Sequence, residues 1–196
     1  MIGFSKDLPQ TDTAIAYARD MHAGQKRSDG TPFICHPLEV ASMLYDAGAP
    51  DHVIAAGAMH DLIEKTDATE SELRERFTPR VTALVLAVSD DRGISGYAMR
   101  KAALRRQVAS ADDEALTLFA ADKVSKLREL RREAAVESDP HTVPIPVRQI
   151  RARRLKHYRR SLALLEERIP NSPLVGDLHR ELDALLREQT RLAAAH

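Results

Sequence analysis

The chain has 196 residues, and its 29 Lys and Arg are balanced by 29 Asp and Glu, so the formal net charge is zero. This length supports one well-buried core, and a neutral chain has no global field that would attract nucleic acid or an anionic membrane. No run of about 18 apolar residues is present, so we expect no membrane span.

The expected compartment is the cytoplasm. The single cysteine, Cys35, cannot form an intramolecular disulfide, and the first ten residues lack the basic and apolar regions of a signal peptide. The sequence leaves the oligomeric state open.

Helical periodicity runs through most of the chain. Apolar residues recur every three to four positions, with no alternating stretch bounded by hairpin turns. Abundant Ala, Leu, Arg and Glu, with no Trp and few Tyr and Phe, also favour helices over sheets. We therefore predict an all-α bundle of about eight to nine helices. In chain order they are expected at about 12–23, 37–48, 50–65, 69–77, 79–88, 97–109, 112–137, 147–168 and 174–192.

Local signals place several helix ends. Thr11 or Asp12 is the expected N-cap of the first helix, Thr69 with Glu72 forms a capping-box pattern, and Pro79 suits a first helical position. These signals predict three of the helix starts.

A proline-rich segment marks the clearest boundary. Residues 139–146 contain three prolines and should be irregular. We expect a core at 1–146 and two amphipathic helices at 147–196 that pack on it within a single domain.

Two adjacent ionisable residues, His60 and Asp61, fall among small and apolar neighbours in the middle of the predicted helix 50–65. An unpaired buried charge costs several kcal/mol or shifts its pKa, so this pair needs a partner, which a divalent cation would supply. Taken alone the dipeptide is a weak signal, and the alternative is a partly exposed pair.

Two other segments bring similar residues. His36 precedes the helix upstream, and Asp122 interrupts the apolar run 116–121. Two imidazoles and two carboxylates fit Mn, Fe, Co, Zn or Mg, with open positions for water and substrate. Such an ion would lower the pKa of a water molecule and polarise a phosphoryl oxygen.

These residues resemble a known pattern. The order His36, His60-Asp61, Asp122 is similar to the H…HD…D signature of the HD phosphohydrolase superfamily. More narrowly, three segments resemble RelA/SpoT-type alarmone hydrolases, including their small stand-alone forms: GQKR…GTPFICHP at 24–37, MHDLIEKT at 59–66 and ADKVSKLR at 121–128. The likeness extends over about residues 10–160.

The resemblance implies a function. His36, His60, Asp61 and Asp122 become the metal ligands, with manganese the usual ion. The family hydrolyses the 3′-pyrophosphate of guanosine tetra- and pentaphosphate. We expect the hydrolase unit alone, without a synthetase or regulatory domain.

Glu64 matches the family's first acidic residue after the His-Asp pair. It lies four residues after His60, on the same helix face, and is our candidate for orienting or deprotonating the attacking water, with Asp61 beside it in the catalytic group. The alternative for Glu64 is a surface residue paired with a lysine.

Two lysines depart from the family pattern. Lys65 and Lys126 stand where the family carries Asp and Asn. Each lies four residues after an aspartate ligand, so helical spacing projects both ammonium groups toward the ligands, where they could bind phosphate. The alternative is a solvated residue at a helix end and a member of a basic surface run.

Three further cations are candidate substrate contacts. Lys26 and Arg27 lie in the loop that leads to His36, and Arg27 matches a family arginine that contacts the nucleotide, although Ser28 replaces the usual lysine. Arg128 ends the third motif. A solvated loop pair is the alternative for the first two.

The remaining histidines and a basic stretch receive other roles. The stretch at 148–160 is interpreted as an amphipathic helix whose arginines are solvated or line the cleft edge, rather than as a nucleic-acid surface. We expect surface or packing roles for His22, His52, His141, His157, His179 and His196.

The sequence therefore predicts a metal-dependent nucleotide phosphohydrolase. One alternative keeps the chemistry but acts on another nucleotide or phosphomonoester, as Lys65 and Lys126 suggest. Another is a non-catalytic sensor that holds metal and nucleotide, against which Glu64 and the four ligands argue.

Overall fold

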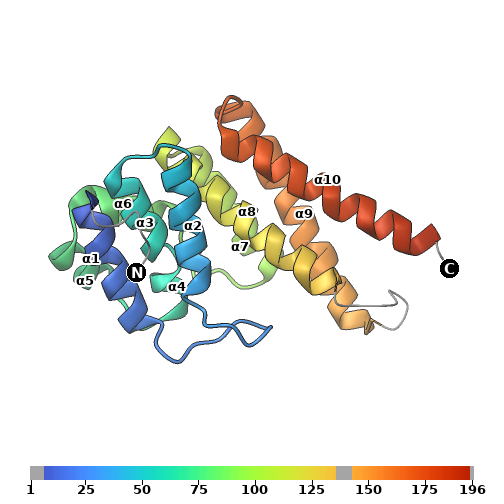
Figure 1. Ribbon diagram of the computed structural model, residues 1–196, viewed down its shortest axis with the longest axis horizontal. Coiled ribbons are helices and arrows are strands. Elements are labelled where there is room, and N and C mark those ends of the chain that lie inside the picture. Colours follow the sequence, from blue (N-terminus) through green and yellow to red (C-terminus); the bar gives the residue numbers. More distant parts are fainter. Residues whose placement is uncertain (1–6, 136–142, 195–196) are drawn as a thin grey trace.

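The computed structural model describes residues 7–135 and 143–194. This part of the chain forms ten helices and one isolated β-bridge, between Lys26 and Pro32, which confirms the all-α prediction (Figure 1). No helix in these ranges is long and apolar enough to cross a membrane. The helices are α1 (Pro9–Met21), α2 (Cys35–Asp46), α3 (Asp51–Met59), α4 (Leu62–Lys65), α5 (Glu70–Arg76), α6 (Pro79–Val88), α7 (Tyr97–Ala109), α8 (Asp113–Ala135), α9 (Ile145–Arg168) and α10 (Pro173–Ala194).

The prediction of one continuous helix over 50–65 is wrong. It is divided at His60 and Asp61 into α3 and the single turn α4. The carbonyl of Gly57, in the last turn of α3, accepts a hydrogen bond from His60 Nδ1 at 2.8 Å. Because the His60 side chain donates to the Gly57 carbonyl, α3 can end here without leaving that carbonyl unpaired. The break places His60 and Asp61 side by side at a helix junction.

The predicted cap of α1 is also wrong. The helix begins at Pro9, ahead of Thr11 and Asp12, and the capping group comes from another helix. The Asp51 carboxylate, at the start of α3, accepts hydrogen bonds from the backbone N–H groups of Gln10 and Thr11 at 3.0 and 2.9 Å. This carboxylate satisfies orphan donors at the N-terminus of α1 and ties it to α3.

Helix α3 lies at the centre of the N-terminal half and packs against α1, α2, α6 and α8. Every residue from Val53 to Met59 is buried. A Cβ at Gly57 would lie 2.5 Å from Leu44 Cδ1 and 3.6 Å from the Ala41 Cα, so the glycine allows α2 and α3 to approach closely. This close crossing holds α2 beside the segment that follows α3.

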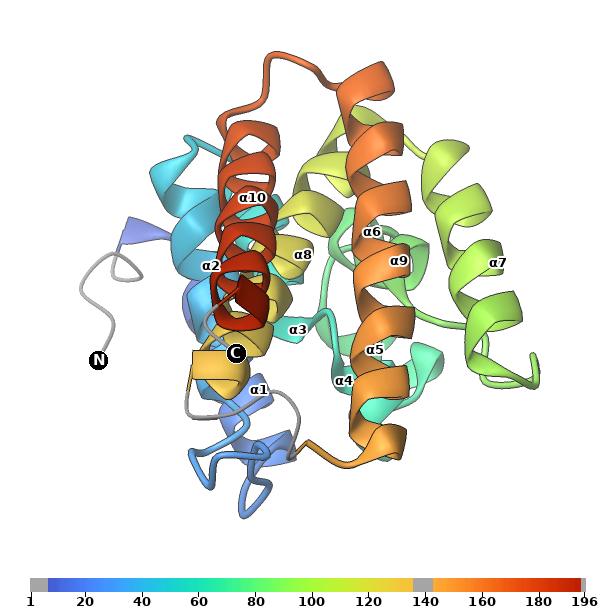
Figure 2. The same ribbon diagram turned by 90° about the vertical axis from the view of Figure 1, so that its right-hand side faces the viewer.

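Helix α8 connects the two halves of the fold. Its neighbours include α2, α3 and α6 on one side and α9 and α10 on the other, and α7 also packs on α9 (Figure 2). One cluster of buried apolar residues extends from Ala14 in α1 to Leu185 in α10. Half of the predicted irregular segment 139–146 lies outside the described residues, and of the other half Ile145 and Pro146 already belong to α9.

Candidate metal centre and its cleft

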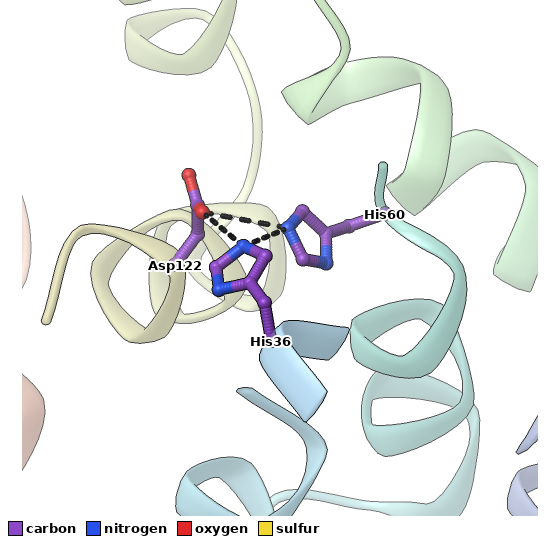
Figure 3. A group of neighbouring side chains, drawn as sticks. All are labelled: His36, His60 and Asp122. Atoms are coloured by element: carbon purple, nitrogen blue, oxygen red, sulfur yellow. Dashed lines mark hydrogen bonds and ion pairs between the residues drawn. The ribbon is translucent and has the colours of Figure 1, made fainter. Parts of the chain in front are cut away.

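Two histidines and an aspartate from three helical segments converge (Figure 3). His36 lies in the first turn of α2, His60 follows α3, and Asp122 lies in the middle of α8. The Nε2 atoms of His36 and His60 are 3.1 Å apart, and Asp122 Oδ1 is 3.2 and 3.4 Å from them. All three side chains are buried, and their ligand atoms are close enough to hold one ion.

Asp61 completes the group of four predicted ligands. Its Oδ2 lies 3.5 Å from His36 Nε2 and its Oδ1 lies 3.5 Å from His60 Nε2. Asp61 Oδ2 is buried and accepts no hydrogen bond in the described part of the chain, and Asp122 Oδ1, which is also buried, faces both imidazoles and the Lys126 ammonium. Neighbouring ligands of a small divalent cation, each about 2.1 Å from it, lie about 3 Å apart. The spacing of His36, His60 and Asp122 therefore suits one small divalent cation, and Asp61 lies 3.5 Å from both imidazoles.

Hydrogen bonds to Nδ1 orient both imidazoles. His60 Nδ1 donates to the carbonyl of Gly57, and His36 Nδ1 lies 2.8 Å from Ser125 Oγ. The Ser125 hydroxyl donates its own proton to Glu39 Oε2 at 2.8 Å, so it accepts from His36. Both rings thus carry a proton on Nδ1 and turn Nε2 toward the cluster, as metal-ligating histidines do.

The buried charges shift one another's pKa values. Burial lowers the pKa of His36 to about 4. Burial also lowers the pKa of His60, but the charge of Asp61 and a hydrogen bond to Asp122 outweigh it, so that pKa is raised. Burial raises the pKa values of both carboxyl groups, but nearby cations and imidazoles hold them below their usual range. Both carboxyl groups are therefore ionised at neutral pH, as ligation requires.

A cleft with a cavity volume of about 570 Å³ opens beside the cluster, and His36 and Asp61 form part of its wall. Its other walls come from the loop 24–34, the junction 61–65, the segment after α6, and helices α7, α8 and α9. Five carboxylates and nine cationic side chains line it. The cations are Lys26, Arg27, Lys65, Arg92, Arg100, Lys101, Lys123, Lys126 and Arg154. This excess of positive charge suits a ligand with several phosphate groups.

Four of the five predicted substrate contacts line the cleft. Lys26 and Lys65 are exposed there, whereas Arg27 is mostly buried, with its Nε 3.1 Å from Glu129 Oε1. The ammonium of Lys126 reaches the clustered carboxylates, as its spacing predicts: Nζ is 3.0 Å from Asp122 Oδ1 and 3.5 Å from Asp61 Oδ1.

The prediction for Arg128 is contradicted. Its Nε lies 3.0 Å from Glu181 Oε1 on α10, and Arg128 is not among the residues that line the cleft. Six residues along a helix correspond to a rotation of about 240°, so Arg128 faces a different side of α8 from Asp122. Arg128 joins α8 to α10 instead.

Glu64 lies in the cleft wall. Its Oε1 accepts a hydrogen bond from the backbone N–H of Asp90 at 2.7 Å. This hydrogen bond anchors one oxygen of Glu64 to the segment after α6.

Several cleft residues have no clear sequence signal. Lys101 reaches the cleft from α7, and Arg154 and Tyr158 reach it from α9, within the stretch 148–160 noted in the sequence. His157, expected to have a surface or packing role, is buried in this wall, and its Nδ1 accepts a hydrogen bond from Arg105 Nη1 at 2.7 Å. These residues come from helices far apart in sequence, so no local motif unites them.

Two histidines and two aspartates cluster in a helical bundle, beside a cleft lined by cations. This arrangement is typical of an all-α domain with a metal-binding site. The family model described as HD domain matches residues 14–144, which is more than half of the chain. The chain therefore belongs to the HD domain family, and the resemblance noted in the sequence is confirmed.

Curated relatives are similar over part of their length. The chain is 38% identical over 86 residues to the guanosine-3′,5′-bis(diphosphate) 3′-pyrophosphohydrolase of Aquifex aeolicus, covering 44% of this chain and 12% of that protein. It is 34% identical over 127 residues to the GTP pyrophosphokinase of Streptomyces coelicolor, covering 63% of this chain and 15% of that protein. The chain thus spans less than a fifth of either relative.

Two solved structures share the fold. A metazoan ortholog of SpoT that hydrolyzes ppGpp has a TM-score of 0.72 and 23% identity, covering 92% of this chain and 95% of that one. The protein lmo0812 from Listeria monocytogenes EGD-e has a TM-score of 0.63 and 24% identity, covering 78% and 99%. At these identities the likeness shows the fold alone.

Proposed function

We propose that this chain is a divalent-metal-dependent phosphohydrolase that removes the 3′-pyrophosphate of guanosine tetra- and pentaphosphate. The observation that carries the proposal is the convergence of His36, His60, Asp61 and Asp122 beside a cleft that is lined by nine cations. The relatives named as guanosine-3′,5′-bis(diphosphate) 3′-pyrophosphohydrolases support the substrate class.

In this proposal the four clustered side chains hold one divalent ion. Manganese is the expected ion, and Fe, Co, Zn and Mg are the alternatives. The ion supplies a Lewis acid that makes water a stronger nucleophile at neutral pH and polarises a phosphoryl oxygen. The hydrogen bonds from His36 to Ser125 and from His60 to Gly57 keep both Nε2 atoms directed at one point.

The chain's own groups then position substrate and water. Glu64 orients the water and accepts its proton as the water oxygen bonds to the phosphorus next to the ribose 3′-oxygen. The bond between this phosphorus and the ribose 3′-oxygen breaks, and the 3′-oxygen gains a proton. The products are pyrophosphate and GDP or GTP. Lys26, Arg27 and Lys65 neutralise phosphate charge in the cleft.

The test is incubation of the purified protein with manganese and a panel of nucleotides that includes guanosine tetraphosphate. Release of pyrophosphate is the expected result. Release of orthophosphate would contradict the proposed reaction and indicate a phosphomonoesterase. Binding without turnover would indicate a non-catalytic sensor.

A second candidate keeps the chemistry but changes the substrate. Lys65 and Lys126 replace the Asp and Asn of the alarmone-hydrolase pattern, and both line the cleft. A cleft with two more cations and one carboxylate fewer than the family pattern presents different partners to a phosphate group, so the alternative substrate is another nucleotide or a phosphomonoester.

We further propose that residues 1–146 and 147–196 form one domain, because the buried apolar cluster continues from α8 into α9 and α10. A cytoplasmic location accords with the single cysteine.

A further inference from the structure

Both oxygens of Asp122 face a lysine. The ammonium of Lys123 contacts Asp122 Oδ2. The ammonium of Lys126 lies 3.0 Å from Asp122 Oδ1 and 3.5 Å from Asp61 Oδ1. Asp122 Oδ1 is the same atom that lies within 3.4 Å of both imidazole Nε2 atoms. Lys126 therefore occupies a carboxylate oxygen that a metal ion would need.

The two lysines differ in their freedom to move. The Lys123 side chain is 2% exposed, and its ammonium lies 4.3 Å from the centroid of the Phe119 ring. It borders the cleft but is almost fully enclosed, and it binds Asp122 Oδ2, not the oxygen that faces the imidazoles. The Lys126 side chain is 25% exposed and lines the cleft. A change of rotamer can move its ammonium from the carboxylates into the cleft.

The local charge balance shows why this movement matters. With neutral imidazoles, the two ligand carboxylates are matched in charge by Lys123 and Lys126. A divalent cation added to this set would meet the Lys126 ammonium at close range in a buried site, where like charges repel strongly. The metal ion binds more favourably if the Lys126 ammonium moves away from the carboxylates. This movement is favoured when an anion in the cleft can pair with the ammonium.

We propose that Lys126 is an exchangeable internal counter-ion: it pairs with Asp61 and Asp122 when no metal is bound, and on metal binding it turns into the cleft to pair with a phosphate group. Metal and phosphate-type anion therefore bind cooperatively, each raising the affinity for the other. This inference rests on the proposed function, since it requires the four side chains to hold a metal.

The test measures Mn²⁺ affinity of the whole chain by the electron paramagnetic resonance signal of free Mn²⁺, with and without sodium sulfate at constant ionic strength. Sulfate is a phosphate-like dianion that chelates Mn²⁺ only weakly. In the wild-type protein we expect sulfate to tighten Mn²⁺ binding. In Lys126→Met we expect Mn²⁺ to bind about tenfold more tightly without sulfate, and sulfate to have little further effect.

A second variant and a control complete the design. Lys126→Asn should behave like Lys126→Met, so the test does not depend on the folding of one variant. Lys156→Asn removes one positive charge from the exposed face of α9 and should leave Mn²⁺ affinity within about twofold of the wild type.

The outcomes separate the two proposals. If both Lys126 variants bind Mn²⁺ no more tightly than the wild type, or if sulfate acts equally on all proteins, the counter-ion role is overturned while the metal site stands. If none of the proteins binds Mn²⁺, the proposed function itself fails. A lower melting temperature of the metal-free Lys126 variants, reversed by Mn²⁺, would support the role, because the carboxylates lose their partner.

Discussion

The Nε2 atoms of His36 and His60 face each other at 3.1 Å, although the two residues are 24 positions apart in the chain. Each ring is held from behind, by Ser125 and by the Gly57 carbonyl, so each presents an Nε2 lone pair when it is neutral. Two such lone pairs repel at this distance unless a proton or a metal ion lies between them. The proposed metal site thus depends on Ser125 and the Gly57 carbonyl, which orient the rings, as well as on the two histidines.

The first prediction concerns Ser125. Its hydroxyl bridges His36 and Glu39, so Ser125→Ala frees the imidazole to rotate or change tautomer. We expect a loss of metal affinity of about tenfold, measured by isothermal titration calorimetry with Mn²⁺. The control is Ser161→Ala, which removes a buried hydroxyl that donates to the His157 carbonyl on α9. Equal affinities in the two variants would contradict the prediction.

The second prediction concerns Glu64. Glu64→Gln keeps the shape of the side chain but removes its ability to accept a proton from water. We expect kcat for guanosine tetraphosphate to fall by about 10² to 10⁴-fold, while Mn²⁺ affinity stays near the wild-type value. A parallel loss of metal binding would instead make Glu64 part of the metal site, and unchanged kcat would remove it from the mechanism.

The third prediction distinguishes the two candidate substrates. In the double variant Lys65→Asp with Lys126→Asn, the chain regains the family residues at both positions. If these lysines bind the alarmone phosphates, kcat/KM for guanosine tetraphosphate falls, because two cations leave the cleft. An increase would show instead that the lysines redirect the site toward another nucleotide.

The fourth prediction concerns His157 and the stability of the fold at acidic pH. Burial, together with the charges of Lys123 and Lys101, lowers the pKa of His157 from 6.5 to about 2. The unfolded chain therefore binds a proton below about pH 6.5 that the folded chain does not bind until about pH 2. The stability contributed by neutral His157 is complete above pH 6.5 and is lost as the pH falls through this window.

In His157→Gln this proton uptake is absent. We expect the fall in unfolding free energy between about pH 6.5 and 5.5, measured by urea titration, to be about 1 kcal/mol smaller than in the wild type. The exposed His179→Gln serves as the control and should keep the wild-type slope. An unchanged slope in His157→Gln would show that His157 already binds a proton in the folded protein.

Much of the fold could be predicted because its signals are local. Periodic apolar residues mark the helices, Thr69 and Glu72 form the predicted capping box, and Pro79 begins α6. The two features that were predicted wrongly depend on contacts that have no sequence signature. Asp51 caps α1 from another helix, about 40 residues away. His60 lies only three residues from the Gly57 carbonyl that it satisfies, but nothing in the apolar pattern of 50–65 shows that this side chain turns back to end the helix.

The candidate site also has a part that the sequence predicts and a part that it does not. Motif spacing predicts the four clustered residues, and helical spacing predicts the approach of Lys126 to Asp122. The same rule applied to Arg128 would have shown that it faces elsewhere, since it is not three or four residues from Asp122. Lys101 and His157 could not be found, because only the packing of α7 and α9 on the rest of the fold brings them to the cleft.

The most direct test of the central claim is anomalous diffraction at the manganese edge from crystals grown with Mn²⁺. The account predicts one manganese per chain, bound by Nε2 of His36, Nε2 of His60 and the carboxylates of Asp61 and Asp122. Side chains that point apart, or a cluster without an anomalous peak at saturating Mn²⁺, would contradict it.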